Sequence, residues 1–197
     1  GGTFSFYPHR YQTDFVRQMF GALNTGIENV ELRMENKKKE KNVETGFNLS
    51  HPNPRSLKQA QDLNEQAKHR CVGLSVETRP DYITIKELKR FRMLGVTRIE
   101  MGVQQTIDRI LHYNKRGHGI QCVRDAMTLM KDAGFKITIH LMPNLPGASL
   151  EDDYQMFLDM LNDPYLRTDW MKIYPCSVVP YAELEKWWRE GKYKAYK

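Results

Sequence analysis

The 197-residue sequence has few cysteines, no long apolar run and no glycine-rich phosphate loop. The three cysteines, Cys71, Cys122 and Cys176, are far apart and odd in number. They predict reduced thiols in a cytosolic protein, and their spacing matches no metal-ligand pattern. No apolar run is long enough to cross a membrane. Because no glycine-rich loop precedes a helix, a phosphate-binding barrel is disfavoured.

Charge and hydrophobic content fit a soluble globular protein. Hydrophobic residues make up 40% of the chain and charged residues 27%. The length is sufficient for one domain with a sizeable core. The net charge of +6 favours an anionic partner such as RNA or a nucleotide, although many ordinary enzymes carry a similar charge.

Four short segments alternate apolar and polar side chains, as β-strands do. They are Val72–Glu77, Ile99–Gln104, Ile137–Met142 and Met171–Tyr174. Helical stretches separate them, which predicts parallel βα units, right-handed crossovers and a curved sheet. The apolar face of each strand is expected to pack on helices.

The polar faces of these strands carry glutamate, glutamine, histidine, lysine and tyrosine. Parallel strands are normally apolar on both faces, and burying such groups dry and unpaired is costly. The sequence therefore predicts an α/β fold with outer helices and a polar lumen that holds a ligand. Because four strands cannot close a barrel of the usual size, a partial (β/α) barrel is expected.

Apolar periodicity and capping residues predict helices around the strands. Their expected ranges are 10–24, 57–69, 85–94, 121–133, 150–162 and 182–190. The first is expected to bury a stripe formed by Phe15, Met19, Ala22 and Leu23, and Ile85 is expected to face inward in the third. Residues 25–56 lose the periodicity and are predicted to form a long, partly mobile loop insertion.

Side chains capable of chemistry follow each predicted strand, where the active groups of parallel βα proteins gather. The four clusters are Glu77–Asp81, Glu100–Gln105, His140–Gly147 and Lys172–Pro175. One such cluster is a modest signal. Four in order, each after a strand, are specific and predict a site at the carboxyl ends of the strands.

This series resembles the radical S-adenosylmethionine (SAM) enzymes. Within them it is most similar to the family of Elongator catalytic subunits, which modify the wobble uridine of tRNA. The matching segments are Gly1–Phe4, Cys71–Asp81, Ile99–Gln104, Arg116–His118, Lys131–Lys136, Met142–Pro146 and Lys172–Pro175. The resemblance extends from the first residue to the last, and the loop around the lysine cluster matches least.

The resemblance implies a set of SAM-binding residues: Gly1, Gly2, Thr3, Glu77, Arg79, Gln104 and Met142. The glycine pair would meet the amino end of SAM, Glu77 its hydroxyls and Arg79 its carboxylate. Gln104 suits ribose or base edges, since an amide both donates and accepts. The alternatives are a simple turn at the glycines, an internal ion pair of Glu77 with Arg79, and a structural hydrogen bond at Gln104.

The resemblance also implies reactive and RNA-facing residues. Lys172 and Tyr174 leave the last strand together and suit an acyl oxygen or a phosphate, and His140 would bind substrate or move a proton. Glu100 is equally suited to be a charge partner of Lys172. The residues expected on the RNA side are Arg116, His118, Lys192 and Lys194. Capping a loop and docking another segment are the alternatives for these four.

The reaction that the resemblance implies is radical carboxymethylation at C5 of the tRNA wobble uridine, with acetyl-CoA as the acetyl donor. The family's [4Fe–4S] cluster needs three nearby cysteines, which this sequence lacks. Residues 1–197 are therefore expected to be a fragment of the radical SAM domain, inactive alone. The cluster-binding part is expected upstream and an acetyltransferase domain downstream.

Expected partners are tRNA and acetyl-CoA, together with other Elongator subunits or a second copy of the protein. Two rival hypotheses remain. One is a different radical SAM enzyme, such as a relative of the porphyrinogen oxidases. The other is a noncatalytic RNA-binding scaffold.

Overall fold

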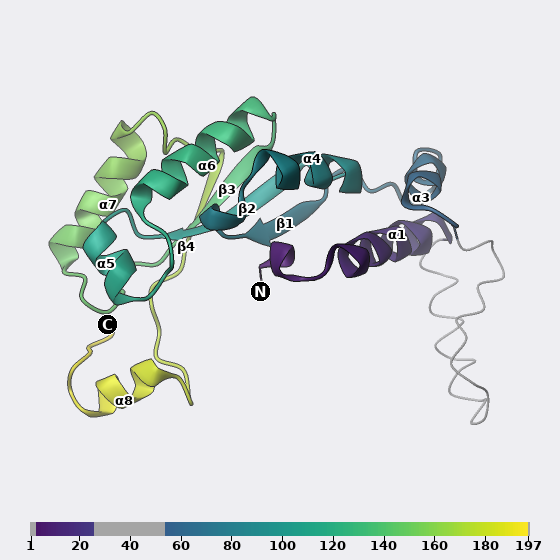
Figure 1. Ribbon diagram of the computed structural model, residues 1–197. Helices are drawn as coiled ribbons and strands as arrows, with labels where there is room; N and C mark the ends of the chain where they lie inside the picture. The colour runs from purple at the N-terminus through teal and green to yellow at the C-terminus, as the bar shows by residue number, and fades with distance from the viewer. Residues whose placement is uncertain (1–2, 26–53, 197) are drawn as a thin grey trace, which may run out of the picture. The chain divides into compact units, whose positions relative to one another are not determined.

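The computed structural model describes residues 3–25 and 54–196 (Figure 1). The loop predicted at 25–56 falls almost entirely outside the described residues. The chain divides into two compact units. The larger contains Gly1–Ser5, Ser75–Arg90 and Thr97–Lys197, and the smaller contains Phe6–Leu74 and Phe91–Val96. No helix of the described residues is long and apolar enough to cross a membrane.

The larger unit is built on a sheet of four parallel strands, which confirms the predicted βα arrangement. The strands are β1 (Ser75–Thr78), β2 (Arg98–Gln104), β3 (Lys136–Leu141) and β4 (Trp170–Ile173). They lie side by side in chain order, and every neighbouring pair is parallel. The sheet is not closed, so the architecture is a partial barrel.

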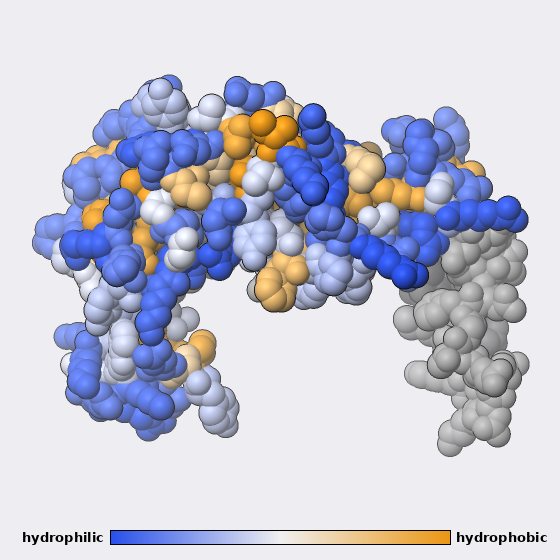
Figure 2. All heavy atoms as spheres, viewed as in Figure 1, coloured by the Kyte–Doolittle hydropathy of each residue, from blue (hydrophilic) through white to orange (hydrophobic). Residues whose placement is uncertain are grey.

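Helices occur between the strands and at both ends of the chain. They are the short helices η1 (Phe4–Phe6) and η2 (Pro80–Tyr82), then α4 (Ile85–Leu94), α5 (Asp108–Tyr113), α6 (Ile120–Asp132), α7 (Leu150–Asn162) and α8 (Glu183–Arg189). Helix α6 packs against β3 (Figure 1). Alternate residues of β2 and β3, such as Met101 and Ile139, are fully buried together with Met127 of α6. Hydrophilic side chains cover most of the visible surface over α5 and α6 (Figure 2).

Two strand predictions were partly wrong at the sheet edges. Pairing of β1 begins at Ser75, opposite Arg98, and Val72 is 88% exposed. On β4, Met171 and Ile173 are 41% and 49% exposed, although they were expected to pack on helices. Both strands lie at the ends of the sheet order, so each has a single paired neighbour among the described residues. Alternation in a sequence shows which residues share a face but not whether another element covers that face.

The smaller unit pairs helix α1 (His9–Thr25) with α3 (Leu57–Asn64). The predicted stripe on α1 was wrong by one residue. Phe15 is 53% exposed, whereas Val16 and Phe20 are buried. On α4, which reaches both units, Ile85 is also exposed, at 61%.

Helix α3 ends five residues before the predicted His69. The Asn64 side chain accepts a hydrogen bond from the Cys71 backbone N–H at 2.7 Å and donates to the His69 carbonyl at 3.2 Å. Asparagine side chains compete with helical hydrogen bonds in this way. The turn that follows Asn64 is therefore held by its amide.

Candidate functional site

A cavity of about 280 Å³ lies at the carboxyl ends of β1, β2 and β3. We call it the strand-end cavity. Its lining residues are Thr3, Glu77, Thr78, Arg79, Glu100, Gly102, Gln104, Arg116 and His140. Most of them are polar or charged, as expected for the polar lumen.

Larger hollows occur elsewhere in the larger unit, with volumes of about 450 to 550 Å³. The largest lies beside α6, where Arg124 is already paired with Asp163 at 2.8 Å. The strand-end cavity is smaller but gathers five titratable side chains from separate elements. Convergent titratable groups are a better marker of a functional site than volume, so we assign the candidate site to the strand-end cavity.

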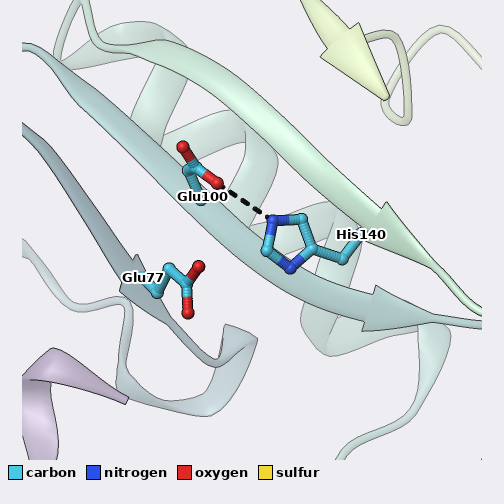
Figure 3. A group of neighbouring side chains, drawn as sticks. All are labelled: Glu77, Glu100 and His140. Carbon is cyan, nitrogen blue, oxygen red and sulfur yellow. Dashed lines mark hydrogen bonds and ion pairs between the residues drawn. The ribbon is translucent and has the colours of Figure 1, made fainter. Parts of the chain in front are cut away.

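The strand register brings the polar residues together. Glu77 lies opposite Glu100, while Gly102, His140 and Lys172 form the next row across β2, β3 and β4. Figure 3 shows Glu77, Glu100 and His140 projecting from the three neighbouring strands into one space.

Glu100 is the most connected side chain of this group. Its Oε2 accepts hydrogen bonds from His140 Nε2 at 3.1 Å and from Lys172 Nζ, and its Oε1 accepts one from Ser75 at 3.0 Å. Burial alone would raise the pKa of Glu100, but the bonds from Lys172, His140 and Ser75 outweigh it and lower the pKa to about 2. The predicted charge pairing of Glu100 with Lys172 is confirmed. The same bond raises the pKa of Lys172, so both groups are charged at neutral pH.

The Glu77 side chain has no hydrogen bond or ion pair within the described part of the chain. One ligand atom from each of Glu77, Glu100 and His140 lies within 4.8 Å of the others, a spacing that could hold a metal ion. Both oxygens of Glu100 already accept hydrogen bonds, and Lys172 supplies a cation there. A metal ion would have to displace Lys172, so this cluster is better suited to hydrogen bonding than to coordination.

Gln104 sits at an irregular point of the sheet. The register of β2 and β3 shifts between Gly102 and Gln104. The backbone of Gln104 has a φ of 72°, a conformation that residues other than glycine rarely adopt. Its buried Oε1 has no hydrogen-bond partner among the described residues. A Cβ at position 102 would lie 2.9 Å from Gln104 Nε2, so any residue other than glycine at this position would push the Gln104 amide out of its observed position. Such strain and an unpartnered polar atom are typical of binding sites.

Arg116 reaches the cavity from the turn that follows α5. Its backbone N–H bonds to the Leu111 carbonyl at 3.0 Å, and Gly117 continues the turn with a φ of 77°. Its Nε is buried without a partner, and no acidic side chain of the described residues pairs with it. Burial, and then repulsion from Arg79, lowers the pKa of Arg116. An anionic ligand would relieve both penalties.

Arg79 is already paired, but not with Glu77. Its guanidinium donates to both carboxylate oxygens of Asp81, at 2.9 and 2.8 Å. The alternative of an internal Glu77–Arg79 ion pair is therefore not found. Because Asp81 neutralises Arg79, Arg116 is the better placed of the two arginines to bind an anion.

The structure places the other predicted site residues at varying distances from the cavity. Thr3 lines it, while Gly1 and Gly2 lie outside the described residues. Met142 is not part of the lining, and its backbone N–H bonds to the Gln104 carbonyl at 2.9 Å. Tyr174 is half-exposed and lies edge-on to the His140 ring, with the ring centroids 5.8 Å apart.

The residues expected on the RNA side are scattered. His118 lies 3.4 Å from the Val103 carbonyl, and burial lowers its pKa. Lys192 is exposed and pairs with Glu190, whereas Lys194 accepts a hydrogen bond from Asn144 through its backbone carbonyl. Arg116 alone of the four lines the strand-end cavity.

Sequence reasoning missed a buried polar network behind the cavity. Asp153 of α7, only 3% exposed, accepts hydrogen bonds from the Asn144 backbone, Gln105 and Tyr196 at 2.6, 3.1 and 2.7 Å. Tyr193 donates to the Asn144 carbonyl at 2.9 Å. The network ties residues 193–196 to the turn after β3. An acidic residue at an inward position of an amphipathic helix was the available sequence signal.

Parallel βα units with a polar cavity at the strand ends define a class of α/β proteins that bind a ligand at this edge. Within that class, the family model of the radical SAM superfamily matches residues 9–160. The chain therefore belongs to the radical SAM superfamily, as the sequence resemblance implied.

Curated relatives match the whole chain. It is 39% identical over 197 residues to the tRNA uridine(34) acetyltransferase of Methanocaldococcus infernus, covering 100% of this chain and 32% of the relative. It is 33% identical over 196 residues to Elongator complex protein 3 of Saccharomyces cerevisiae, covering 100% of this chain and 30% of that protein. The chain thus spans about a third of the length of these relatives, and its resemblance to Elongator catalytic subunits is confirmed.

Solved structures agree with these matches. The archaeal Methanocaldococcus infernus Elp3, lacking residues 1–46 of its own sequence, superposes with a TM-score of 0.81 at 38% identity, covering all of this chain and 40% of that one. The coproporphyrinogen III oxidase of Escherichia coli superposes with a TM-score of 0.53 at 18% identity, covering 70% of this chain and 31% of that one. The second similarity shows the fold alone.

Radical SAM enzymes use SAM and a [4Fe–4S] cluster. The strand-end cavity fits SAM, because the unpartnered Arg116 and Gln104 atoms suit a carboxylate and a hydroxyl, and the unpaired Glu77 accepts hydrogen bonds. The cavity does not fit the cluster. No cysteine of the described residues lines it, and Cys71, Cys122 and Cys176 are separate, half-buried thiols.

Proposed function

We propose that this chain is the SAM-binding part of an Elongator-type tRNA uridine(34) acetyltransferase, a cytoplasmic enzyme. The observation that carries the proposal is the pair of buried, unpartnered polar groups, Arg116 Nε and Gln104 Oε1, in the strand-end cavity of a radical SAM chain. The proposed reaction is carboxymethylation at C5 of the wobble uridine with acetyl-CoA as donor. Since the chain spans about a third of its relatives, residues 1–197 are proposed to work within a longer protein.

The proposed roles follow the position of each side chain. Arg116 binds the SAM carboxylate, and Gln104 and Glu77 bind hydroxyls or the base edge. Thr3, with the preceding glycines, would meet the amino group of SAM. The remaining residues assigned to SAM are Arg79, which would assist through its paired guanidinium, and Met142, which would shape the wall.

When bound, SAM supplies the radical that removes a hydrogen atom from the substrate in this superfamily. The residues of this chain contribute orientation and proton control. Lys172 stays protonated beside Glu100 and donates to an acyl oxygen, while His140 holds a donor and an acceptor next to it. Tyr174 is half-exposed and lies edge-on to His140, where its phenol group could donate a hydrogen bond to the substrate.

The proposed partners are tRNA and acetyl-CoA, with further Elongator subunits or a second copy of the protein. Lys194 is exposed and available to RNA phosphates, and the exposed Lys192 would exchange its Glu190 partner for a phosphate. His118 lies close to Arg116 in the chain. A role of Arg116 in SAM binding replaces its expected role on the RNA side in this proposal.

Equilibrium SAM binding by the intact protein tests the proposal. Arg116→Ala and Gln104→Ala are each expected to weaken SAM binding at least about tenfold, or about 1.4 kcal/mol. Arg124→Ala, which removes an arginine paired with Asp163 away from the cavity, is the matched control and should leave binding unchanged. Unchanged affinity in Arg116→Ala would refute the assignment of the cavity.

A second measurement tests the reaction. The intact protein, loaded with its cluster and with acetyl-CoA present, should release 5′-deoxyadenosine from SAM faster when tRNA is added. SAM binding without release would support a noncatalytic scaffold. Release of 5′-deoxyadenosine at the same rate with and without tRNA would support another radical SAM reaction.

A further inference from the structure

Glu100 joins all four strands of the sheet on the cavity side. Glu100 lies on β2 and accepts hydrogen bonds from Ser75 on β1, from His140 on β3 and from Lys172 on β4. Its side chain is 12% exposed, and that of His140 is 16% exposed. One carboxylate therefore fixes the two side chains to which we assign the substrate chemistry.

The ionised state of Glu100 determines what its partners can do. A carboxylate only accepts hydrogen bonds, so His140 Nε2 must carry a proton. A neutral His140 is then the Nε2–H tautomer, and its Nδ1 is an acceptor. Lys172 is held as an ammonium, which donates and cannot serve as a base.

We propose that Glu100 is the positioning residue of the strand-end cavity: it orients Lys172 as a fixed donor and His140 as a fixed tautomer, and without it both lose their alignment. The proposal rests on the proposed function for the roles of Lys172 and His140. The hydrogen bond from Lys172 to Glu100 lies within this chain, and its effect on the reactivity of the Lys172 amine can be measured without enzyme turnover.

The first test measures the amine reactivity of Lys172. Intact cofactor-free protein is acetylated with acetic anhydride over a pH series, and modification of each lysine is quantified by mass spectrometry. In Glu100→Gln, the half-maximal reaction of Lys172 is expected to move down by about one pH unit, because the charge that holds its proton is gone. Tyr174 and Glu77 also face Lys172 and raise its pKa, but less than Glu100 does.

Two controls accompany this measurement. Exposed Lys89 on α4 is the internal reference and should keep its profile in every variant. Ser75→Ala removes one hydrogen bond from Glu100 without touching Lys172 and should shift Lys172 by no more than a few tenths of a pH unit. A Glu100→Gln profile that coincides with the wild type overturns the proposal.

Wild-type protein gives a second route if Glu100→Gln fails to fold. Lys172 is then expected to reach half-maximal reaction at a higher pH than Lys89 does, because Glu100 stabilises its protonated form. A Lys172 profile at or below that of Lys89 would overturn the proposal without any substitution.

Kinetics separate positioning from a merely structural role. Glu100→Gln is expected to keep SAM affinity within about threefold, while tRNA-dependent kcat falls more than tenfold and KM changes little. Glu100→Asp, which restores the charge on a shorter stem, should recover part of the loss. Equal losses in kcat and SAM affinity would overturn the positioning role. The two proposals can fail separately. If the Lys172 profile shifts in Glu100→Gln but the wild-type protein shows no tRNA-dependent turnover, the pairing of Glu100 with Lys172 is supported and the proposed function is refuted.

Discussion

Replacing Asp153 by alanine should loosen the turn after β3 and release the end of the chain. Asp153 is 3% exposed and accepts three hydrogen bonds, from the Asn144 backbone N–H, the Gln105 amide and the Tyr196 hydroxyl. Alanine removes the common acceptor of all three donors. The prediction concerns a local opening, because the donors belong to three different segments.

The magnitude follows from the burial of each donor. The Asn144 N–H and the Gln105 amide lose their acceptor in residues that are 6% and 0% exposed, whereas Tyr196 is 44% exposed and can bond to water. Each of these two buried donors costs about 1 to 3 kcal/mol when it lacks a partner, so the local free energy of opening should fall by about 2 to 6 kcal/mol. A loss of about 2 kcal/mol corresponds to a roughly 30-fold larger population of the locally open state.

Hydrogen exchange followed by mass spectrometry measures this in the intact protein. Peptides covering 143–148 and 191–196 should exchange at least about 30-fold faster in Asp153→Ala than in the wild type. Glu151→Ala, an exposed substitution on the same helix, is the matched control and should change neither peptide. Less than a threefold increase in Asp153→Ala, or the same increase in the control, would refute the reasoning.

Three further predictions concern the cavity and the tail. Gly102→Ala should weaken SAM binding about tenfold while the protein stays folded, because the new Cβ displaces the flexible Gln104 amide; full affinity in a binding titration would contradict this. Glu100 has its pKa lowered from 4.5 to about 2, so its pairing stabilises the fold above pH 4.5 and the benefit disappears as pH falls to about 2. The difference in unfolding free energy between wild type and Glu100→Gln should therefore shrink by about 1 to 3 kcal/mol across that range, and a constant difference would show that the pairing is absent. Tyr193→Phe removes the donor to two backbone carbonyls and should speed exchange in 191–196, measured as above.

The sheet could be predicted because alternation is a local property of the sequence. All four strands follow from side chains that repeat with a period of two, and their parallel direction follows from the helices between them. Their burial did not follow. Met171 and Ile173 have the right pattern, yet they are half-exposed because β4 has one neighbour among the described residues. Burial depends on which element covers a face, and that is not encoded in one strand.

The cavity could be predicted in part for the same reason. Glu77, Glu100, Gln104 and His140 were placed on the polar face by their position in each strand, and all four line the cavity. Their partners were harder to predict. The Arg79 side chain bonds to Asp81, two residues later in the chain, and not to Glu77, two residues earlier. Pairing between charged groups depends on rotamers and turns, which a strand pattern does not specify.

Arg116 shows most clearly what the sequence concealed. Helix α5 is six residues long and begins after Ile107, which provides no side-chain cap, so no start signal marked it. The turn after α5 carries Arg116 back to the strand ends. One side of the cavity therefore holds Glu100, whose charge the neighbouring Lys172 neutralises, and the other holds the buried guanidinium of Arg116 without an anion. A ligand that brings its own carboxylate completes the second side without disturbing the first, which is why the two sides can serve cofactor and substrate separately.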